Sequence, residues 1–276
     1  MYQKKYTFFI LFIFINSYSF SQQLINETIQ HDGEMREYSI FLPSTYQIGQ
    51  SLPMVFNLHG FGSNRAQQTF YSGLNNLAEL ENFIVVIPQG LTRTTINGQT
   101  GSHWNAYFGT DVDDLGFFSL LIDRVYTDYN IDLARVYSTG MSNGGYMSHR
   151  LACELSDRIT AVASVTGGVF FEQLDNCNPS RAVPVMQIHG TNDGIVNFNG
   201  ITLFAPSIPD LVYHWVDHNN CTTLADTIEI ANISITDNST VEKLEYNNGD
   251  EDSKVWFYIV ENGGIVGQML PLIYQE

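Results

Sequence analysis

The chain has few basic residues, few cysteines and only one long apolar run. Each of these features excludes some classes of function. Of its 276 residues, 12 are lysine or arginine and 29 are aspartate or glutamate, so the formal net charge is −17. Such acidity argues against nucleic acid and anionic membrane surfaces as partners, because both repel a negatively charged protein. Neutral substrates or solid polymers fit the charge, although a surface that only keeps the protein in solution explains it equally well.

The apolar run lies at the N-terminus. Lys4 and Lys5 precede eight consecutive apolar residues at 8–15, and the small-x-small sequence Ser19-Phe20-Ser21 follows. This pattern is typical of a secretory signal peptide over residues 1–21, with an apolar core too short to cross a bilayer. We therefore expect a secreted protein, extracellular or periplasmic, with no membrane association after cleavage and a formal charge of −19 once the two lysines are removed.

Residues 22–276 are expected to form one α/β domain with a single large core. Short apolar runs alternate with helical patterns, which predicts a doubly wound, mostly parallel sheet with helices on both faces. The expected strands lie near 26–31, 36–42, 53–58, 83–88, 134–139, 160–165, 183–188 and 254–260. The expected helices lie near 66–80, 115–129, 143–155 and 208–218, and a further strand pair is expected within 221–253.

The pentapeptide Gly140-Met141-Ser142-Asn143-Gly144 is a G-x-S-x-G pattern. An expected strand precedes it and an expected helix follows it, which puts Ser142 at the tip of a sharp turn with its hydroxyl exposed. The flanking glycines remove side chains that would collide with the strand and the helix. The pattern alone is weak, and its position between strand and helix makes Ser142 the candidate nucleophile.

A nucleophilic serine needs a base and a carboxylate that orients the base. The expected strand at 183–188 runs into the loop Thr191-Asn192-Asp193-Gly194 at its carboxyl end, where ligand chemistry gathers in open α/β sheets. Asp193 is therefore the candidate acid, and an ordinary Asp-Gly turn is the alternative.

An oxyanion hole is expected in the loop His59-Gly60-Phe61-Gly62, which follows the strand at 53–58. The backbone N–H groups of Phe61 and of Asn143, the residue after the nucleophile, are the natural donors. His59 precedes Ser142 in the chain, so we interpret it as a residue that positions this loop and not as the base.

These motifs resemble those of the secreted polyhydroxybutyrate-depolymerase-like esterases of the α/β-hydrolase fold, close to the feruloyl and acetylxylan esterases of carbohydrate esterase family 1. The resemblance covers roughly residues 35–264 and is specific only as a combination. It implies a serine ester hydrolase with Ser142 as nucleophile and Asp193 as acid. The matching residues are Leu58-His59-Gly60 with Gly62, Trp104-Asn105, residues 112–117, residues 135–137 leading to 140–145, residues 151–154, and His189-Gly190-Thr191 with Asp193.

The family's catalytic histidine should follow the last strand in a Gly-Gly-His-x-Trp-Pro stretch. Here the strand at 254–260 runs into Glu261-Asn262-Gly263-Gly264 and then into Ile265-Val266-Gly267-Gln268-Met269-Leu270, and no histidine follows. The chain departs from the pattern where the base should be, so the protein as written is expected to be nearly inactive.

A reading-frame shift would explain the departure. Residues 265–270 can be encoded as ATA GTT GGC CAG ATG CTT, and one cytosine placed in front changes the reading to CAT AGT TGG CCA GAT GCT, which encodes His-Ser-Trp-Pro-Asp-Ala. We therefore expect that a one-base deletion, in the gene or in its sequencing, altered the chain after Gly264. The nucleotide sequence tests this directly.

No other histidine stands where the family places its base. His214 and His218 lie four residues apart on an expected helix, but without a third ligand we expect no metal and no cofactor. The remaining histidines fall on an N-terminal strand, in loops, or near Ser142 and Asp193, at positions 31, 59, 103, 149 and 189.

Three cysteines in a secreted chain allow one disulfide and one remaining thiol. Cys153–Cys177 is the expected pair, and Cys221 is then unpaired or has lost its partner with the altered C-terminus. Trp104 and Tyr107, in the Gly-rich loop at 98–110, are candidates for contact with an aromatic acyl group or a sugar, and simple packing is the alternative for Trp104.

The sequence thus predicts a serine esterase for polymer- or polysaccharide-linked acyl groups, namely hydroxyalkanoate, feruloyl or acetyl esters. The alternative is a non-catalytic polymer- or glycan-binding protein on a hydrolase scaffold.

Overall fold

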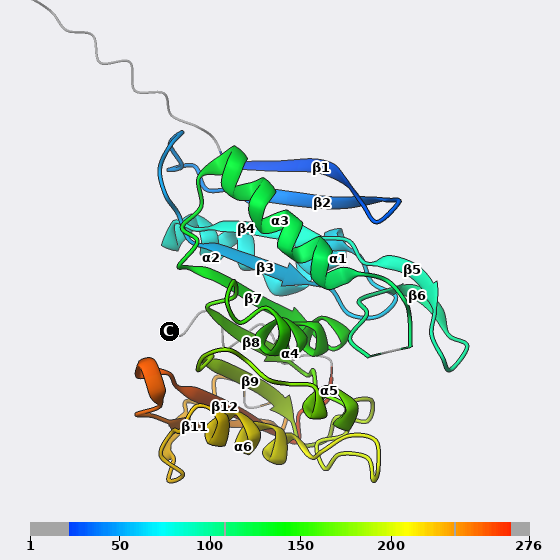
Figure 1. Ribbon diagram of the computed structural model, residues 1–276. Coiled ribbons are helices and arrows are strands. Elements are labelled where there is room, and N and C mark those ends of the chain that lie inside the picture. Colours follow the sequence, from blue (N-terminus) through cyan, green and yellow to red (C-terminus); the bar gives the residue numbers. More distant parts are fainter. Residues whose placement is uncertain (1–21, 108, 235, 266–276) are drawn as a thin grey trace, which may run out of the picture.

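The computed structural model describes residues 22–107, 109–234 and 236–265. The expected signal peptide and the segment after Ile265 lie outside these residues. One sheet of ten strands runs through the molecule in the order β1-β2-β4-β3-β7-β8-β9-β12-β11-β10 (Figure 1). Its strands are β1 (Gln23–His31), β2 (Glu34–Leu42), β3 (Met54–Leu58), β4 (Ile84–Pro88), β7 (Val136–Met141), β8 (Ala161–Val165), β9 (Val185–Gly190), β10 (Asp226–Ile230), β11 (Thr240–Tyr246) and β12 (Val255–Glu261).

The centre of this sheet is parallel and its two sides are antiparallel. The strands from β4 through β3, β7, β8 and β9 to β12 all run in the same direction. The pairs β1–β2 and β10–β11 extend the sheet as antiparallel strands at its two edges. The predicted mostly parallel α/β sheet is confirmed, and β10 and β11 are the strand pair expected within 221–253.

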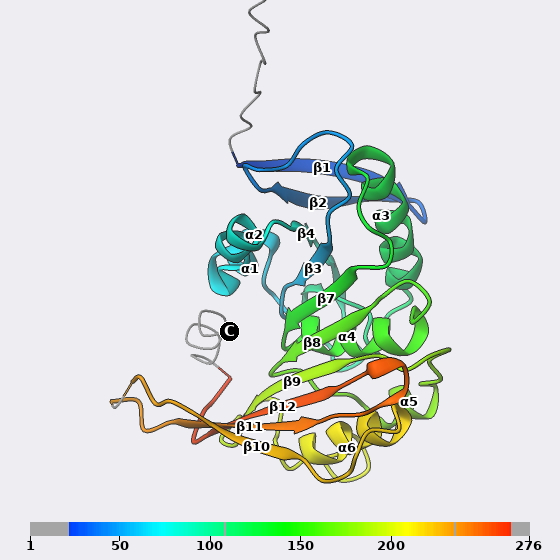
Figure 2. The ribbon, with the colours of Figure 1, turned by 90° about the vertical axis from the view of Figure 1, so that its left-hand side faces the viewer.

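Helices lie on both faces of the sheet (Figure 2). One face carries α3 (Asp114–Tyr129), α4 (Asn143–Glu154) and α6 (Ile208–His218), with the short α5 (Phe171–Asp175) beside them, and the other face carries α1 (Arg65–Ser72) and α2 (Leu74–Glu81). The side chain of Asp113 caps α3 by accepting a hydrogen bond from the Gly116 N–H, and Ser207 caps α6 in the same way.

Two sequence predictions about elements need correction. The helix expected over 66–80 is two helices, because Gly73 takes a left-handed conformation with φ of 60° that ends α1. The Gly-rich loop expected over 98–110 contains part of a hairpin, formed by β5 (Leu91–Thr94) and β6 (Thr100–His103). Its strands are short and polar, so they lack the apolar pattern by which the other strands were recognised.

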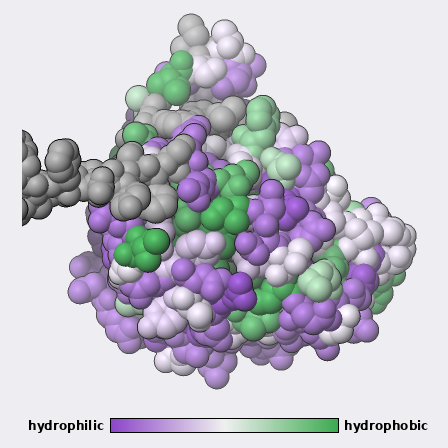
Figure 3. Space-filling view, turned by 90° about the horizontal axis from the view of Figure 1, so that it is seen from above, coloured by the Kyte–Doolittle hydropathy of each residue, from purple (hydrophilic) through white to green (hydrophobic). Residues whose placement is uncertain are grey.

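The main core fills the space between the sheet and α3, α4 and α6, with Trp104 and Trp215 among its largest fully buried side chains. A buried ion pair, Arg36–Asp114 with 2.6 Å between Nη2 and Oδ1, ties β2 to the start of α3. Seen from above, the surface is mainly hydrophilic, with apolar side chains in separate groups (Figure 3). In the part of the chain that the structure describes, no helix has the length and apolar character needed to cross a membrane.

Cys153, near the end of α4, forms a disulfide with Cys177, which follows α5. Cys221 is a buried free thiol, and burial raises its pKa. Disulfides form and persist in oxidising compartments, so this bond fits an exported protein.

Candidate active site

Ser142 lies between the end of β7 and the first residue of α4, at the carboxyl edge of the parallel strands. Its backbone has φ of 53° and ψ of −118°, a conformation that a residue with a side chain rarely adopts. The Ser142 N–H donates to the Val165 carbonyl over 2.8 Å, which ties the turn to the end of β8. The side chain is only partly buried, so a substrate can reach the hydroxyl.

Close backbone packing holds this turn in place. A Cβ added to Gly144 would lie 2.3 Å from the Leu58 carbonyl oxygen, and one added to Gly140 would lie 2.5 Å from the Gly144 carbonyl carbon. Both glycines are therefore required because β3, β7 and α4 approach each other more closely than side chains allow. A Cβ on Gly60 would lie 3.5 Å from the Ser142 Cβ, so the loop after β3 lies beside the serine.

The two backbone donors expected for an oxyanion hole lie on either side of Ser142. Among the described residues, neither the Phe61 N–H nor the Asn143 N–H donates a hydrogen bond. Asn143 is the first residue of α4, and the first N–H groups of a helix have no partner within it. The positive end of the helix dipole also points at this position, which favours a developing negative charge.

Trp104 is fully buried, and its backbone and indole groups contact the loops around Ser142. Its backbone N–H donates to Asn143 Oδ1 over 2.8 Å, and its carbonyl accepts from Asn143 Nδ2 over 3.1 Å. Its indole N–H donates to the His59 carbonyl over 3.0 Å. Trp104 thereby fixes both loops that carry the free N–H groups, which is the packing role that sequence left open.

Tyr107 contacts the end of α4 that lies away from Ser142. Its hydroxyl donates to Glu154 Oε1 over 3.0 Å, and the Arg150 guanidinium lies 4.9 Å from its ring centre. Glu154 is the last residue of α4, so this contact lies about 16 Å along the helix axis from the residue after the nucleophile. Burial and the neighbouring Glu154 carboxylate raise the pKa of Tyr107 to about 12.

Asp193 is buried, with 4 % of its surface exposed, in the loop after β9. Its Oδ1 accepts hydrogen bonds from the N–H groups of Ile195 and Val196, over 2.8 and 2.9 Å. Its Oδ2 is buried and accepts no hydrogen bond from any residue that the structure describes. One carboxylate oxygen is thus held by the loop, and the other lies 3.6 Å from His189 Nε2, which is too far for a hydrogen bond, so it can accept one from a closer donor.

The end of β12 lies against this loop. The Asn192 N–H donates to the Gly263 carbonyl over 2.9 Å, and the Thr191 N–H donates to the Val260 carbonyl over 3.0 Å. The residues that follow Gly264 therefore start next to Asp193, and the first of them is Ile265.

A buried chain of side-chain hydrogen bonds runs from α6 through α4 and β9 towards Asp193. The Trp215 indole N–H donates to His149 Nδ1 over 3.2 Å, and His149 Nε2 lies 3.0 Å from Gln187 Oε1. Gln187 Nε2 lies 3.1 Å from His189 Nδ1, and His189 Nε2 lies 2.8 Å from the Val196 carbonyl in the Asp193 loop. These contacts are all satisfied when both histidines are neutral and carry their proton on Nε2.

The same contacts occupy the acceptor nitrogens of the nearby histidines, which a general base would need free. The acceptor nitrogen of His149 is occupied by Trp215, that of His189 by Gln187, and that of His59 (Nε2) by the Gly90 N–H over 2.9 Å. Burial lowers the pKa of all three, to about 4 for His59 and His149. A proton on any of these nitrogens would displace a donor already bonded to it.

The other histidines have different partners. His103 Nδ1 donates to the Gly101 carbonyl over 2.9 Å, His31 contacts Asp113, and His218 contacts the Arg181 carbonyl. No histidine within the described ranges bonds to the Ser142 hydroxyl. Nor do those ranges contain a group of three His, Cys, Asp or Glu side chains arranged to hold a metal ion.

Sequence reasoning missed Gln187 and Tyr146. Gln187 joins His149 to His189 at the centre of the buried chain of hydrogen bonds. The sequence feature that could have indicated this role is an amide side chain within a mainly apolar strand. Tyr146 lies on the first turn of α4, four residues after Ser142, so the two share one helix face. Burial and the charge of Asp193 raise the pKa of Tyr146.

Replacing Gln187 with leucine tests the buried chain. Gln187→Leu leaves His149 Nε2, His189 Nδ1 and the Gly167 carbonyl without their partner, so we expect a loss of about 3 kcal/mol or more in the free energy of unfolding. Urea denaturation measures this loss. The control is Gln67→Leu on the exposed side of α1, which should change stability by less than about 0.5 kcal/mol. Equal effects of the two substitutions would contradict the assignment.

The buried neutral histidines also predict a dependence of stability on pH. His59 and His149 have a pKa of about 4 in the folded chain and about 6.5 when unfolded. The unfolded state binds more protons between these values, so stability is complete above pH 6.5 and falls as the pH drops towards 4. Each histidine contributes a slope of up to about 1.4 kcal/mol per pH unit.

Urea denaturation at pH 7.5 and pH 5.0 measures this slope. The His149→Asn variant cannot titrate at that position, so its stability should fall less between the two pH values than that of the unmodified chain. A free energy of unfolding that is the same at both pH values would show that the histidines are not buried in their neutral form.

Comparison with known proteins places these features in context. The model of a protein family described as esterase PHB depolymerase matches residues 36–225. The chain is 29% identical over 203 residues to a bifunctional acetylxylan esterase/xylanase of Neocallimastix patriciarum, an alignment that covers 74% of this chain and 27% of the relative. It is 31% identical over 182 residues to feruloyl esterase D of Neurospora crassa, which covers 62% of this chain and 57% of that protein. The chain thus spans between about a quarter and three fifths of these curated relatives.

Solved structures show the same fold. An acetyl xylan esterase from Aspergillus awamori superposes with a TM-score of 0.57 at 14% identity, covering 87% of this chain and 93% of that one. An S-formylglutathione hydrolase from Agrobacterium tumefaciens superposes with a TM-score of 0.56 at 13% identity, covering 72% of this chain and 84% of that one. At such low identity these likenesses establish the architecture and nothing further.

Proposed function

Because this chain belongs to the PHB depolymerase family of esterases, we propose that its site is built to hydrolyse carboxylic esters through an acyl-enzyme on Ser142. The observation that carries this proposal is the conformation of Ser142, which holds a reachable hydroxyl in a strained turn beside two unpaired backbone N–H groups. This turn combines backbone strain with close packing of glycines, and a turn with a purely structural role needs neither.

In the proposed reaction the Ser142 oxygen attacks the ester carbonyl carbon while its proton passes to a histidine. The negative oxygen of the tetrahedral intermediate is stabilised by the N–H groups of Phe61 and Asn143. The carbon–oxygen bond to the alcohol then breaks, and the alcohol leaves with the proton from the histidine. Water repeats the sequence on the acyl-enzyme, which releases the acid and restores the serine.

The histidine that this mechanism needs is proposed to belong at position 265. Asp193 Oδ2 lacks a donor among the described residues, and the chain that follows Gly264 begins beside the Asp193 loop. A histidine there would donate to Oδ2 and leave its second nitrogen for Ser142, as the Ser-His-Asp arrangement requires. We propose that a shift of reading frame replaced this histidine with Ile265.

The proposed substrates are esters of polymer- or polysaccharide-linked acyl groups, namely feruloyl, acetyl or hydroxyalkanoate esters, and the proposed setting is outside the cell after removal of residues 1–21. The named relatives include a feruloyl esterase and an acetylxylan esterase. The chain's acidity fits an uncharged substrate better than an anionic one.

A fluorophosphonate probe tests the nucleophile. In a chain with histidine restored at position 265, the probe should form one adduct per molecule on Ser142, detected by intact mass and peptide mapping. Ser142→Ala should form none. Labelling at another residue, or no labelling with the fold intact, would contradict the proposed nucleophile.

A second candidate function is a non-catalytic polymer- or glycan-binding protein on the hydrolase scaffold. It is favoured by the absence, among the described residues, of any histidine bonded to Ser142. Binding of xylan or polyhydroxybutyrate by the unmodified chain, without ester hydrolysis by either the unmodified or the repaired chain, would establish this alternative.

A further inference from the structure

One face of the parallel sheet is covered over only part of its width. On the side where α1 and α2 lie, these helices contact β3 and β4, and β7, β8, β9 and β12 carry no helix there among the described residues (Figure 2). Parallel strands are normally covered on both faces, because both of their faces are apolar. This half of the sheet therefore lacks its expected cover.

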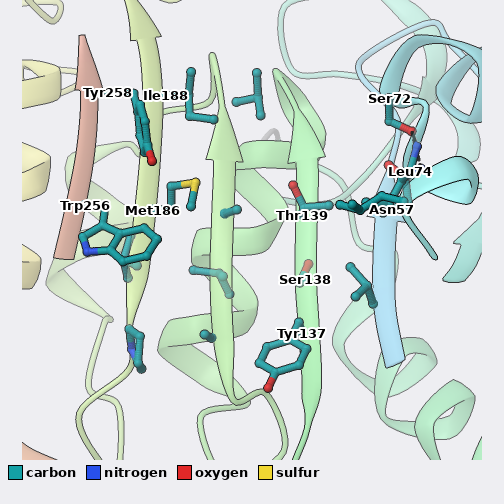
Figure 4. Close-up of a pocket in the computed structure, with 18 of the residues that line it drawn as sticks. Asn57, Ser72, Leu74, Tyr137, Ser138, Thr139, Met186, Ile188, Trp256 and Tyr258 are labelled. Atoms are coloured by element: carbon teal, nitrogen blue, oxygen red, sulfur yellow. Dashed lines mark hydrogen bonds between the residues drawn. The ribbon is translucent and has the colours of Figure 1, made fainter. Parts of the chain in front are cut away.

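The uncovered part forms an apolar groove of about 700 Å³. Its floor crosses β7, β8, β9 and β12, with Tyr137 and Thr139 from β7 and Met186 from β9 pointing into it (Figure 4). Along these strands the residues on the α4 side are buried, whereas Tyr137, Thr139, Ala161, Ala163 and Met186 on the groove side remain partly exposed.

Between β7 and β9, β8 lines the groove with the small side chains of Ala161 and Ala163. Leu74 at the start of α2 stands at one end, and Trp256 and Tyr258 on β12 stand at the other. The Trp256 indole nitrogen is buried and has no hydrogen-bond partner among the described residues. The groove thus has an apolar lining and one hydrogen-bond donor, the Trp256 indole N–H, that no described residue accepts from.

We propose that in the chain as it stands this groove is the docking site of segment 266–276. The docking requires only the apolar composition and the length of the segment, so it does not depend on whether a reading-frame shift produced these residues. The path of the chain supports this occupant. Gly263 is bonded to Asn192, two residues beyond β9, and β9 is one of the strands that form the floor. Beyond β12 the described chain passes to the side of the sheet where α1 and α2 lie (Figure 2).

The composition and the length of this segment fit the groove. Its 11 residues carry no lysine or arginine and one carboxylate side chain, Glu276. Crossing from β12 to β7 takes about 14 Å at the usual strand spacing. Eleven residues span about 16 Å as a helix and about 36 Å when extended. Its large apolar residues are Val266, Met269, Leu270, Leu272, Ile273 and Tyr274.

Tryptophan quenching tests the docking. Trp256 lies in the groove and is only partly buried, whereas the other two tryptophans, Trp104 and Trp215, are fully buried. We compare chain 22–276 with chain 22–265 and measure the fraction of emission that acrylamide reaches. Removal of the segment should raise this fraction from near zero to roughly one third, since one tryptophan of three becomes accessible. The rise should disappear in a Trp256→Phe version of the shorter chain.

A second variant keeps the full chain and blocks the groove. Ala163→Trp fills the floor, so it should release the segment and raise the rate at which chymotrypsin cuts after Met269, Leu272 or Tyr274 by at least tenfold. Ala134→Trp, on an exposed loop, is the matched control and should leave the cleavage rate unchanged. Rapid cleavage of the unmodified chain, at the rate of the Ala163→Trp variant, would overturn the proposal.

The other possible occupants of the groove give distinct results, each of which would also overturn it. A second copy of the chain would make Trp256 quenching depend on protein concentration in both the long and the short chain. A co-purified apolar molecule would appear by mass spectrometry after solvent extraction, and its removal would expose Trp256 while residues 266–276 were still present. All these measurements report on the groove and not on ester hydrolysis, so they do not depend on the proposed esterase function.

Discussion

Restoring a histidine after Gly264 is expected to increase ester hydrolysis on the order of 10⁴-fold or more in kcat. The change replaces the chain after Gly264 with His-Ser-Trp-Pro-Asp-Ala, and the Ile265→His single substitution is its minimal form. The reason is that an unassisted serine hydroxyl is a weak nucleophile, and no histidine of the described chain is bonded to Ser142. Hydrolysis of p-nitrophenyl acetate by the unmodified and repaired chains measures the effect.

The controls separate catalysis from better folding. Ser142→Ala and Asp193→Asn in the repaired chain should each lose most of the gain, and circular dichroism should show the same fold in all variants. Comparable rates for the unmodified and repaired chains would mean that another group supplies the base. Repaired activity should also rise with pH through the pKa of the new histidine, because only the neutral form accepts the proton from the serine.

Gly144→Ala is expected to cost about 3 kcal/mol or more in the free energy of unfolding, the second large effect. The added methyl group would lie 2.3 Å from the Leu58 carbonyl oxygen and 2.9 Å from that of His59. Both contacts are to backbone atoms, so no flexible side chain can move aside, and β3 and α4 must separate. Thermal and urea denaturation measure the loss, and in the repaired chain the same substitution should abolish activity because it displaces Ser142.

Gly194→Ala is the matched control for this prediction. A Cβ on Gly194 has no neighbour within 4 Å and this glycine lies next to Asp193, so the substitution should change stability by less than about 0.5 kcal/mol. If Gly144→Ala were as mild as Gly194→Ala, the close approach of α4 to β3 would not be required for folding.

The fold class was predictable because the central strands have a recognisable apolar pattern in the sequence. A parallel strand covered on both faces is a continuous apolar run, and β4, in which every residue is buried, is such a run. The β5–β6 hairpin was missed because its strands are short, polar and only partly buried. The break at Gly73 was missed because the apolar pattern continues across it from α1 into α2.

The candidate site was predictable in part. Ser142 and Asp193 could be proposed because each belongs to a local motif that follows the end of an expected strand. Such motifs can be recognised directly in the sequence. The roles of Trp104 and Tyr107 could not be predicted in this way. An aromatic residue in a loop has the same sequence context whether it packs into the core or faces a ligand. Only the contacts of Trp104 with Asn143 and His59 show that it holds in place the two loops beside Ser142.

By itself the sequence determined the α/β architecture, the strained turn at Ser142, and the lack of a histidine after the last strand. These follow from periodicity, from glycines at fixed spacing and from residue identity, which are properties of neighbours in the chain. The tertiary structure alone decided that the acceptor nitrogens of His59, His149 and His189 are already bonded, that Asp193 Oδ2 accepts no hydrogen bond from the described residues, and that an apolar groove crosses one face of the sheet. Hydrogen-bond partners and coverage depend on residues far apart in sequence, and only the folded chain brings them together.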